Sequence, residues 1–257
     1  MGELLFIGLG LHDDTDIPLR SLDAARASDR LFLDTYTSIL PGLDRTRLAA
    51  AVGRPVELAG RADVEGGEAI LEAASRGRAA LLVPGDPMTA TTHLDLRLRA
   101  HARGIPTRVF HAASILTAAA GLLGLHVYKF GPAVTIPRPQ RSYRPSSPYE
   151  RLAENRSRGQ HTLALLDTGE GTDPLPAAEA LRFLLSLEGE LRLGACARDT
   201  LCCAAARVGS PSPVTAAATV AELLETELGP PPHVLVFPAD LHFTEEEALR
   251  AFAGLRS

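Results

Sequence analysis

Short apolar runs alternate with helix-like stretches through the first half of the chain, and this alternation limits the fold more than any other feature. Strands are predicted at 4–9, 30–34, 55–59, 79–85 and 106–112. Helices are predicted between them, one over 65–78 that ends at Gly77 and one over 93–104 that ends at Gly104. A chain that alternates strand and helix in this way favours a mainly parallel, twisted α/β sheet.

The composition changes near residue 137, where a loop rich in proline and arginine begins. Beyond this loop the apolar pattern predicts strands at 161–167 and 233–239, a helix over 174–188, one or two closely packed strands within 194–209, and a final helix that Thr244 caps. The second half of the chain is therefore expected to be richer in β-structure than the first.

Composition and charge exclude several classes of protein. The apolar fraction of 46% and the charged fraction of 22% are sufficient for a buried core, which excludes intrinsic disorder for most of the chain. The net charge of -5 argues against a surface built for bare nucleic acid. No apolar run reaches the roughly 18 residues of a membrane span, and the first residues lack the basic region of a secretory signal. Three cysteines, two of them adjacent, form no disulfide framework. A soluble cytosolic protein is expected.

The motif GLGL at 8–11 follows the first predicted strand directly. Because glycine has no side chain, a ligand can approach such a backbone closely. The motif is thus either a ligand-binding wall or a tight turn after a core strand, and it lacks the third glycine of the dinucleotide-binding fingerprint. Asp16 is the expected N-cap of the helix that follows, with Pro18 in its first turn.

The motif VPGDPMTATTH at 83–93 ends the most apolar strand with a Pro-Gly-Asp-Pro turn. Ligands of open α/β sheets bind at the carboxyl ends of the strands, which is where Asp86 stands. Its carboxylate could accept hydrogen bonds from a ribose or pair with an ammonium group. The alternative is a plain structural turn in which Asp86 bonds its own backbone.

The other candidate groups have simpler interpretations. The segment 111–131, which begins with the candidate cap Ser114, is either a core helix or a surface for close packing of a ligand. His161 and His233 open predicted core strands and are interpreted first as structural histidines. Cys202 and Cys203 would fill the core from opposite faces of a strand. The sequence has no HExxH, CxxC, G-x-S-x-G or Walker A motif, so a metal site is not expected.

The chain resembles the diphthine synthase family of the tetrapyrrole-methylase superfamily over nearly its whole length. The motifs that carry the resemblance occur in the same order, as GLGL, YTS at 36–38, PGDP-x-x-ATTH, H-x-YKFG and PPH. The resemblance implies a protein of two α/β domains, 1–111 with the GLGL and PGDP loops and 112–257 completing the donor site, with the ligand cleft between them. It implies S-adenosyl-L-methionine as methyl donor, with S-adenosyl-L-homocysteine as product.

The resemblance also implies which residues contact the donor, several of them through backbone groups. The positions that match the family's motifs are Leu11, Asp86, Thr89, Ser114, Ile115, Leu166, Ala206 and His233. This chain departs from the family pattern at three places. Asp34 and Thr35 stand where a glutamate and an aromatic residue usually precede YTS, and Thr89 replaces a commonly aliphatic residue. The segment after Asp167 is shorter and less basic, which concerns the contact with a protein substrate and not the donor site.

The function that the resemblance implies is methylation of a protein. The substrate would be translation elongation factor two, at a histidine that bears a 3-amino-3-carboxypropyl group, whose amine is methylated to give diphthine. A homodimer, a cytoplasmic location, and no contact with nucleic acid or membrane are expected with it. An α-amino group with a pKa of about 8 is partly neutral near pH 7, so no strong dedicated base is required and no catalytic residue is assigned. Alignment of the reacting atoms would supply most of the rate.

Two other functions stay open: a tetrapyrrole or precorrin C-methyltransferase of the same fold, and a non-catalytic module that binds an adenosyl ligand. The most basic stretch of the chain contains Arg138, Arg141, Arg144, Arg151, Arg156 and Arg158. These arginines either contact the protein substrate or lie on a solvated loop and helix face.

Overall fold

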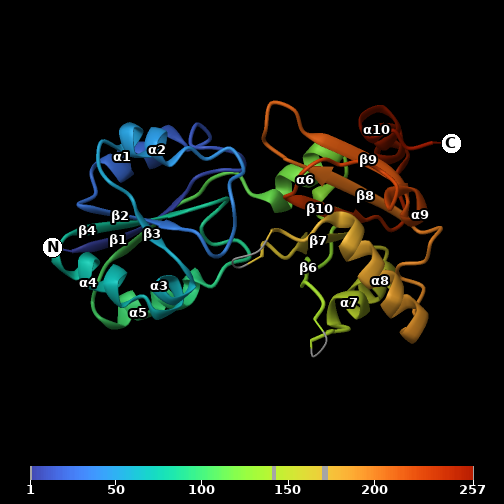
Figure 1. Cartoon of the computed structure of the whole chain (residues 1–257), viewed down its shortest axis with the longest axis horizontal. Helices are drawn as coiled ribbons and strands as arrows, with labels where there is room; N and C mark the ends of the chain where they lie inside the picture. The colour runs from blue at the N-terminus through green and yellow to red at the C-terminus, as the bar shows by residue number, and fades with distance from the viewer. Residues whose placement is uncertain (1, 141–142, 170–172, 257) are drawn as a thin grey trace. The chain divides into compact units, whose positions relative to one another are not determined.

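The computed structural model describes residues 2–140, 143–169 and 173–256, and the chain divides into two compact units (Figure 1). Unit 1 extends to Ile115 and unit 2 begins at Leu116. The division predicted between residues 111 and 112 lies slightly earlier in the chain. Each unit has its own sheet and its own hydrophobic core. The predicted fold class, two α/β domains, is confirmed.

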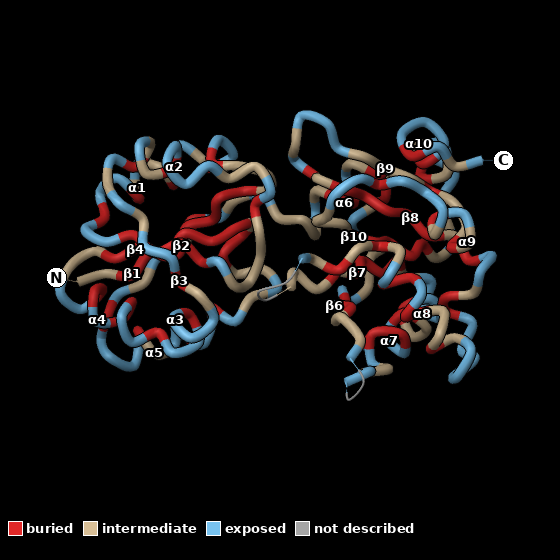
Figure 2. The backbone as a smooth tube through the Cα atoms, in the orientation of Figure 1, coloured by how far each residue is buried: buried red, intermediate tan, exposed pale blue. Residues whose placement is uncertain are grey.

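The sheet of unit 1 has the strand order β3-β2-β4-β1-β5, and every neighbouring pair is parallel. The strands are β1 (Glu3–Gly8), β2 (Arg30–Asp34), β3 (Glu57–Ala59), β4 (Arg78–Val83) and β5 (Thr107–Phe110). Nearly all residues of β1 and β4 are buried, as in strands that helices cover on both faces (red in Figure 2). Each strand overlaps a predicted apolar run, so the predicted parallel sheet is confirmed.

Helices cover both faces of this sheet (Figure 1). They are α1 (Leu19–Arg26), α2 (Arg45–Val52), α3 (Arg61–Gly66), α4 (Glu68–Arg76) and α5 (His93–Ala102). One hydrophobic cluster packs α1 and α2 against the sheet through Ala25 and Leu48, and a second packs α4 and α5 through Leu71 and Leu96. The single helix predicted over 65–78 is wrong, because Gly67 adopts a φ of +66° and separates α3 from α4.

The sheet of unit 2 has the order β6-β7-β10-β8-β9. The strands are β6 (Val134–Ile136), β7 (Thr162–Leu166), β8 (Leu201–Ala206), β9 (Val214–Thr219) and β10 (His233–Phe237). β6 and β7 are parallel, and the other neighbours are antiparallel. The segment 194–209 supplies only β8. Its partner β9 lies beyond the predicted segment, because the half-buried sequence VTAAAT has no continuous apolar run.

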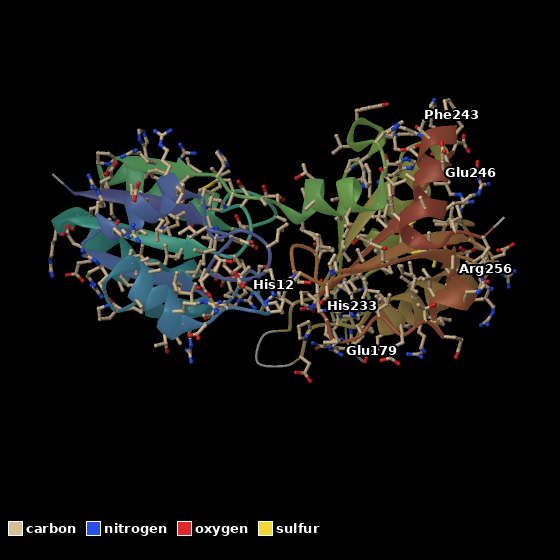
Figure 3. The ribbon with its side chains drawn as sticks, turned by 90° about the horizontal axis from the view of Figure 1, so that it is seen from above. His12, Glu179, His233, Phe243, Glu246 and Arg256 are labelled. Carbon is tan, nitrogen blue, oxygen red and sulfur yellow. The ribbon has the colours of Figure 1, made fainter. Side chains whose placement is uncertain are left out.

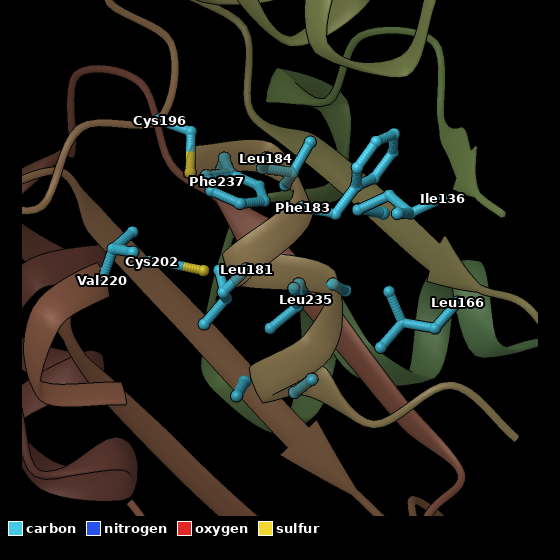
Figure 4. Packing of buried hydrophobic residues seen from close by; sticks show 14 of the residues in the cluster. Ile136, Leu166, Leu181, Phe183, Leu184, Cys196, Cys202, Val220, Leu235 and Phe237 are labelled. Carbon is cyan, nitrogen blue, oxygen red and sulfur yellow. The ribbon is translucent and has the colours of Figure 1, made fainter. Parts of the chain in front are cut away.

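The helices of unit 2 are α6 (Ile115–Leu123), η1 (Val127–Lys129), α7 (Ser147–Ser157), α8 (Ala177–Leu191), α9 (Val220–Leu223) and α10 (Phe243–Ala253). The core packs Leu181 and Leu184 of α8 against Leu235 and Phe237 of β10 (Figure 4). Cys202 and Cys203 are fully buried, which confirms them as core residues, and burial raises the pKa of both thiols. In the part of the chain that the structure describes, every helix is too short or too polar to cross a bilayer.

The start of α10 differs from the prediction. The N-cap is His242 rather than Thr244, and the His242 ring accepts a hydrogen bond from the Thr244 N–H. Glu245 completes the turn by accepting a hydrogen bond from the His242 N–H at 2.8 Å. The side chain of Glu245 is thereby placed inside unit 2, where it has further partners described below.

Candidate functional site

The loops after β1 and β4 meet at the carboxyl end of the unit 1 sheet. β4, β1 and β5 are neighbours in that sheet, so their following loops emerge side by side. Gly85 donates a backbone hydrogen bond to the Gly10 carbonyl at 2.7 Å, and Gly10 donates to the Gly85 carbonyl at 3.4 Å. A side chain at Gly8 would place its Cβ only 2.6 Å from the Gly85 oxygen and 2.7 Å from the Cβ of Ala112. The glycines of GLGL therefore permit three loops to converge.

The loop that carries Leu11 is held by Asp16. The Asp16 carboxylate accepts hydrogen bonds from the backbone N–H groups of Leu11, at 3.1 Å, and of His12, at 2.7 Å. Asp16 is therefore not the N-cap of the following helix as predicted, because α1 begins at Leu19 after the cap residue Pro18. The aspartate fixes the backbone of the first loop instead.

Asp86 organises the loop that follows β4. Its carboxylate accepts hydrogen bonds from the Met88 N–H at 3.0 Å, the Thr89 hydroxyl at 3.2 Å, the His111 ring at 2.7 Å and the Ala112 N–H at 3.4 Å. A carboxylate offers about four lone-pair positions, and four donors from this chain occupy them. Burial alone would raise the pKa of Asp86, but the hydrogen bonds from Met88 and His111 outweigh it, and the pKa is lowered.

His111 is a functional candidate that the sequence reasoning missed. Its Nδ1 lies 2.7 Å from Oδ2 of Asp86, while its side chain is 71% exposed. Asp86 itself is only 9% exposed. The sequence does hold a signal for it, because His111 is the first residue after a strand next to β1 and stands at the same edge of the sheet as Asp86.

A second aspartate–histidine pair lies on the other side of the same loop. Oδ2 of Asp34, at the end of β2, lies 3.0 Å from Nε2 of His93, and Nδ1 of His93 lies 2.8 Å from the Pro87 carbonyl. Both side chains are completely buried. Asp34 also accepts hydrogen bonds from the backbone N–H groups of Tyr36 and Thr37, so that it ties the YTS segment to the loop after β4.

The hydrogen bonds of this buried pair lower the pKa of its carboxyl group. Burial raises the pKa of Asp34, but hydrogen bonds from His93 and Thr37 outweigh it, and the net shift is downward. Asp34, which departs from the family pattern, thus forms a buried hydrogen-bonded pair with His93.

The remaining predicted residues of unit 1 lie around the same loops. Thr89 is half-buried and donates its hydroxyl to Asp86. Ser114 and Ile115 follow β5, and Ile115 is the first residue of α6. Together with Leu11 and Asp86, these positions follow three neighbouring strands of one sheet.

A pocket of about 710 Å³ opens beside β5 within unit 1. Its lining includes the apolar residues Met88 and Phe110 and the basic residues Arg20, Arg97, Arg108 and His111. No carboxylate belongs to the lining among the described residues. The pocket is therefore suited to an anionic group and has His111 in its wall.

The three predicted residues of unit 2 gather at one end of its sheet. His233, the first residue of β10, pairs directly with Ala206, the last residue of β8. Leu166 ends β7, whose Leu165 pairs with Val234 of β10. The strand register thus brings together residues that are far apart in sequence, and His233 is labelled in Figure 3.

The ring of His233 is occupied by the protein itself. Nδ1 accepts a hydrogen bond from the Ala177 N–H at 3.1 Å, and Nε2 lies 3.1 Å from the Gly229 carbonyl, to which it donates. Burial lowers the pKa of His233, so the ring is neutral. Any contact of His233 with a ligand would have to use its backbone or the ring face.

His161 has the structural role that was its first interpretation. Its Nδ1 accepts from the Ala239 N–H at 2.9 Å, and its Nε2 donates to Glu245 at 3.0 Å. Burial lowers the pKa of His161. Glu245 is also the partner of Lys129, and although burial raises the pKa of Glu245, the hydrogen bonds from Lys129 and the His242 N–H bring it down to about 2.

The basic stretch of unit 2 is largely neutralised by its own acidic residues. The ion pairs are Arg138 with Glu179, Arg144 with Glu190, and Arg151 and Arg158 with Glu154. This pairing favours the solvated face over a partner-binding surface. Arg141 lies outside the described residues, as do residues 170–172 of the segment after Asp167.

No group of three or more histidine, cysteine, aspartate or glutamate side chains among residues 2–140, 143–169 and 173–256 could hold a metal ion. The carboxylate–histidine pairs found above are hydrogen-bonded at 2.7 Å and 3.0 Å. The chemistry that such pairs support is orientation and proton transfer.

Comparisons with known proteins give a consistent result over the whole chain. The model of the tetrapyrrole (corrin/porphyrin) methylases matches residues 3–224. The diphthine synthase of Methanosphaerula palustris is 46% identical over 253 residues, covering 98% of this chain and 99% of the relative, and that of Methanothermobacter thermautotrophicus is 42% identical over 252 residues, covering 98% and 96%. A crystal structure of diphthine synthase matches with a TM-score of 0.90 and 36% identity, covering 98% of this chain and 96% of that one.

Proposed function

The chain belongs to the tetrapyrrole methylase family, and from that premise we propose that it is an S-adenosylmethionine-dependent diphthine synthase. It methylates the amine of the 3-amino-3-carboxypropyl group on a histidine of translation elongation factor two. The observation that carries the proposal is the identity of 42% and 46% with diphthine synthases over almost the entire length of both chains. The enzyme works as a cytoplasmic homodimer without contact to nucleic acid or membrane.

The loops of unit 1 fit the methyl donor. A Cβ built on Gly85 meets no atom within 4 Å, so open space faces the backbone at Gly85, where the two glycine loops are bonded to each other. Gly10 and Gly85 both adopt positive φ, a conformation that favours glycine, so neither position carries a side chain. A ligand with hydroxyl and amino groups can therefore reach backbone groups here.

The residues proposed to contact the donor are Leu11, Asp86, Thr89, Ser114 and Ile115 of unit 1 and Leu166, Ala206 and His233 of unit 2. Because the Asp86 carboxylate and the His233 ring are engaged within the chain, these two residues act through the backbone they hold. This differs from the predicted pairing of the Asp86 carboxylate with a ribose or an ammonium group.

The donor supplies an electrophilic methyl group on a sulfonium, whose leaving group needs no further activation. The chain must then hold the substrate amine in line and keep it neutral, because a protonated amine has no lone pair. Asp16 and Asp86 hold the two loops, and the buried Asp34–His93 pair holds the second loop through the Pro87 carbonyl. Such positioning lowers the entropic part of the barrier.

One other function has a specific basis. The family model is described by its corrin and porphyrin methylases, which favours a tetrapyrrole C-methyltransferase as the second candidate. The identity of the methyl acceptor separates it from the first proposal. A non-catalytic module that binds an adenosyl ligand would instead transfer no methyl group to any acceptor.

The test is methyl transfer to the protein substrate. The purified chain is incubated with labelled donor and elongation factor two that carries the unmethylated 3-amino-3-carboxypropyl histidine, and the modified peptide is analysed by mass spectrometry. The mass of that peptide is expected to rise in steps of about 14 Da, because each methyl group that replaces a hydrogen adds one CH₂ unit. A factor that stays unmodified while a porphyrinogen accepts the methyl group would replace the first proposal by the second.

A further inference from the structure

We propose that His111 is the proton acceptor of the methyl transfer, with Asp86 as the residue that orients it. The inference rests on the proposed function, because it assigns His111 to the amine that is methylated. It goes beyond the donor contacts, since no catalytic residue was assigned from the sequence.

The hydrogen bond to Asp86 fixes which nitrogen of His111 is free. Asp86 accepts from Nδ1 of His111 at 2.7 Å, so Nδ1 carries the hydrogen in the neutral ring. The lone pair is then on Nε2. A carboxylate that orients an imidazole and stabilises its protonated form is the arrangement that general bases require.

The ring is also accessible to a macromolecular substrate. Its side chain is 71% exposed, while the carboxylate that orients it is buried and held by three further donors. His111 also lines the pocket beside β5. An orienting group that is fixed and an acceptor that is exposed suit a substrate that arrives on the surface of another protein.

The charges around the pocket match the substrate group. The 3-amino-3-carboxypropyl group carries a carboxylate next to its amine, and the pocket wall presents Arg20, Arg97 and Arg108 with no acidic member among the described residues. Arg97 also donates to the Thr107 hydroxyl, and Arg108 lies 3.8 Å from Glu3. Charge complementarity would place the carboxylate among the guanidinium groups and leave the amine to His111.

His111 takes part in the reaction only as a carrier of the proton. Nε2 takes one proton from the substrate ammonium, and the nitrogen lone pair then forms the bond to the methyl carbon while the carbon–sulfur bond breaks and its electron pair stays on sulfur. His111 releases the proton to solvent through its exposed face. The product is again an ammonium, so each further methylation needs the same proton removal.

Two other histidines of unit 1, His93 and His101, do not fit this role. Both ring nitrogens of His93 are engaged and fully buried. His101 is exposed near the end of α5, but no carboxylate orients it among the described residues. His101 therefore serves as a control for the loss of an exposed imidazole.

The decisive variant is His111→Asn, compared with His101→Asn. The asparagine amide nitrogen takes the place of Nδ1 and can still donate to Asp86, but it provides no base at the position of Nε2. We expect single-turnover methylation at pH 7 to fall about a hundredfold for H111N, with donor affinity by calorimetry within about twofold of wild type. H101N should leave both unchanged.

The pH profile separates a proton acceptor from a positioning residue. Above a pH of about 8 the substrate amine loses its proton to water, so the deficit of H111N should shrink as pH rises. Added imidazole should restore part of the rate of His111→Ala. A deficit that stays constant with pH, a fall in donor affinity that accounts for the whole effect, or full activity of H111N would each overturn the proposal.

The tautomer can be tested without any methyl transfer. Nitrogen-15 NMR of the histidine rings should show Nε2 of His111 without hydrogen in the neutral ring, and Asp86→Asn should abolish this preference. A neutral ring with its hydrogen on Nε2 would sink the proposal even if the enzyme is active. An inactive wild type with the expected tautomer would instead refute the proposed function.

Discussion

Two aspartate–histidine pairs hold the loop after β4, and they differ in what the histidine leaves free. In the Asp34–His93 pair both ring nitrogens have acceptors and both side chains are fully buried. In the Asp86–His111 pair the carboxylate is buried, but the ring is exposed. The same two residue types therefore serve stability in one place and offer a reactive nitrogen in the other. What decides between them is the number of partners and the access of solvent to the ring.

The largest effect is expected from breaking the buried pair. His93→Ala leaves the Asp34 carboxylate buried without its imidazole partner and removes the hydrogen bond to Pro87. The free energy of unfolding should fall by about 3–5 kcal/mol, because a buried carboxylate loses the side chain that it is paired with. Urea unfolding measures the loss, with the exposed His101→Ala as control at about 0.5 kcal/mol or less. A loss below about 1 kcal/mol for H93A would mean that the pair does not stabilise the loop.

Glu245 is the buried carboxylate of unit 2, and it allows the contribution of such a group to be measured through the dependence of stability on pH. The pKa of Glu245 lies at about 2, below the ordinary value of 4.5. A lowered pKa stabilises the folded state above pH 4.5, and this contribution is lost as the pH falls toward 2. The displacement corresponds to about 3 kcal/mol.

Glu245→Gln should therefore lower the stability near pH 7 and remove this part of the acid dependence. The free energy of unfolding measured between pH 7 and pH 2 gives both effects. Glu246→Gln is the matched control, because Glu246 is exposed and pairs only with Arg250 among the described residues. An unchanged acid slope in E245Q would show that Lys129 and His161 do not stabilise the ionised carboxylate.

The Asp86–His111 pair, whose histidine is exposed, is tested by removing its carboxylate. Asp86→Ala takes away the acceptor of four hydrogen bonds and should loosen the loop after β4. We expect donor affinity to weaken at least tenfold, about 1.4 kcal/mol, in calorimetric titrations. Asp95→Ala, which removes an exposed carboxylate from α5, should leave the affinity unchanged. Unaltered donor binding by D86A would remove this loop from the donor site.

The pairs also show how far the sequence predicts a site. The parallel strands were predictable because strands buried on both faces are continuous apolar runs. The position of Asp86 at the end of β4 followed from the same pattern. The partnership of Asp86 with His111 did not, because it depends on the order β4-β1-β5, in which β1 lies between the two strands whose ends carry Asp86 and His111.

Local polar contacts were predicted less well for a related reason. Asp16 has the residue type and spacing of a helix cap, yet its carboxylate binds the N–H groups of Leu11 and His12. A short polar side chain can bond to a nearby loop or to a helix end, and the sequence alone gives no preference. For His233, one ring partner, Gly229, lies only four residues earlier in the chain, but the other, Ala177, lies 56 residues away and is brought to the ring only by the fold.

The smallest effect is expected in the pocket that His111 lines. Arg20 is exposed on α1, so Arg20→Gln should leave the stability and the donor affinity unchanged. If the guanidinium groups of this pocket attract the substrate carboxylate, the KM for elongation factor two should rise about threefold at low salt, and the difference should vanish at high ionic strength. Arg45→Gln removes the same charge from an exposed site on α2, outside the pocket, and controls for the change in net charge. An equal rise in KM for both variants would mean that the field of the whole protein, rather than this pocket, steers the substrate.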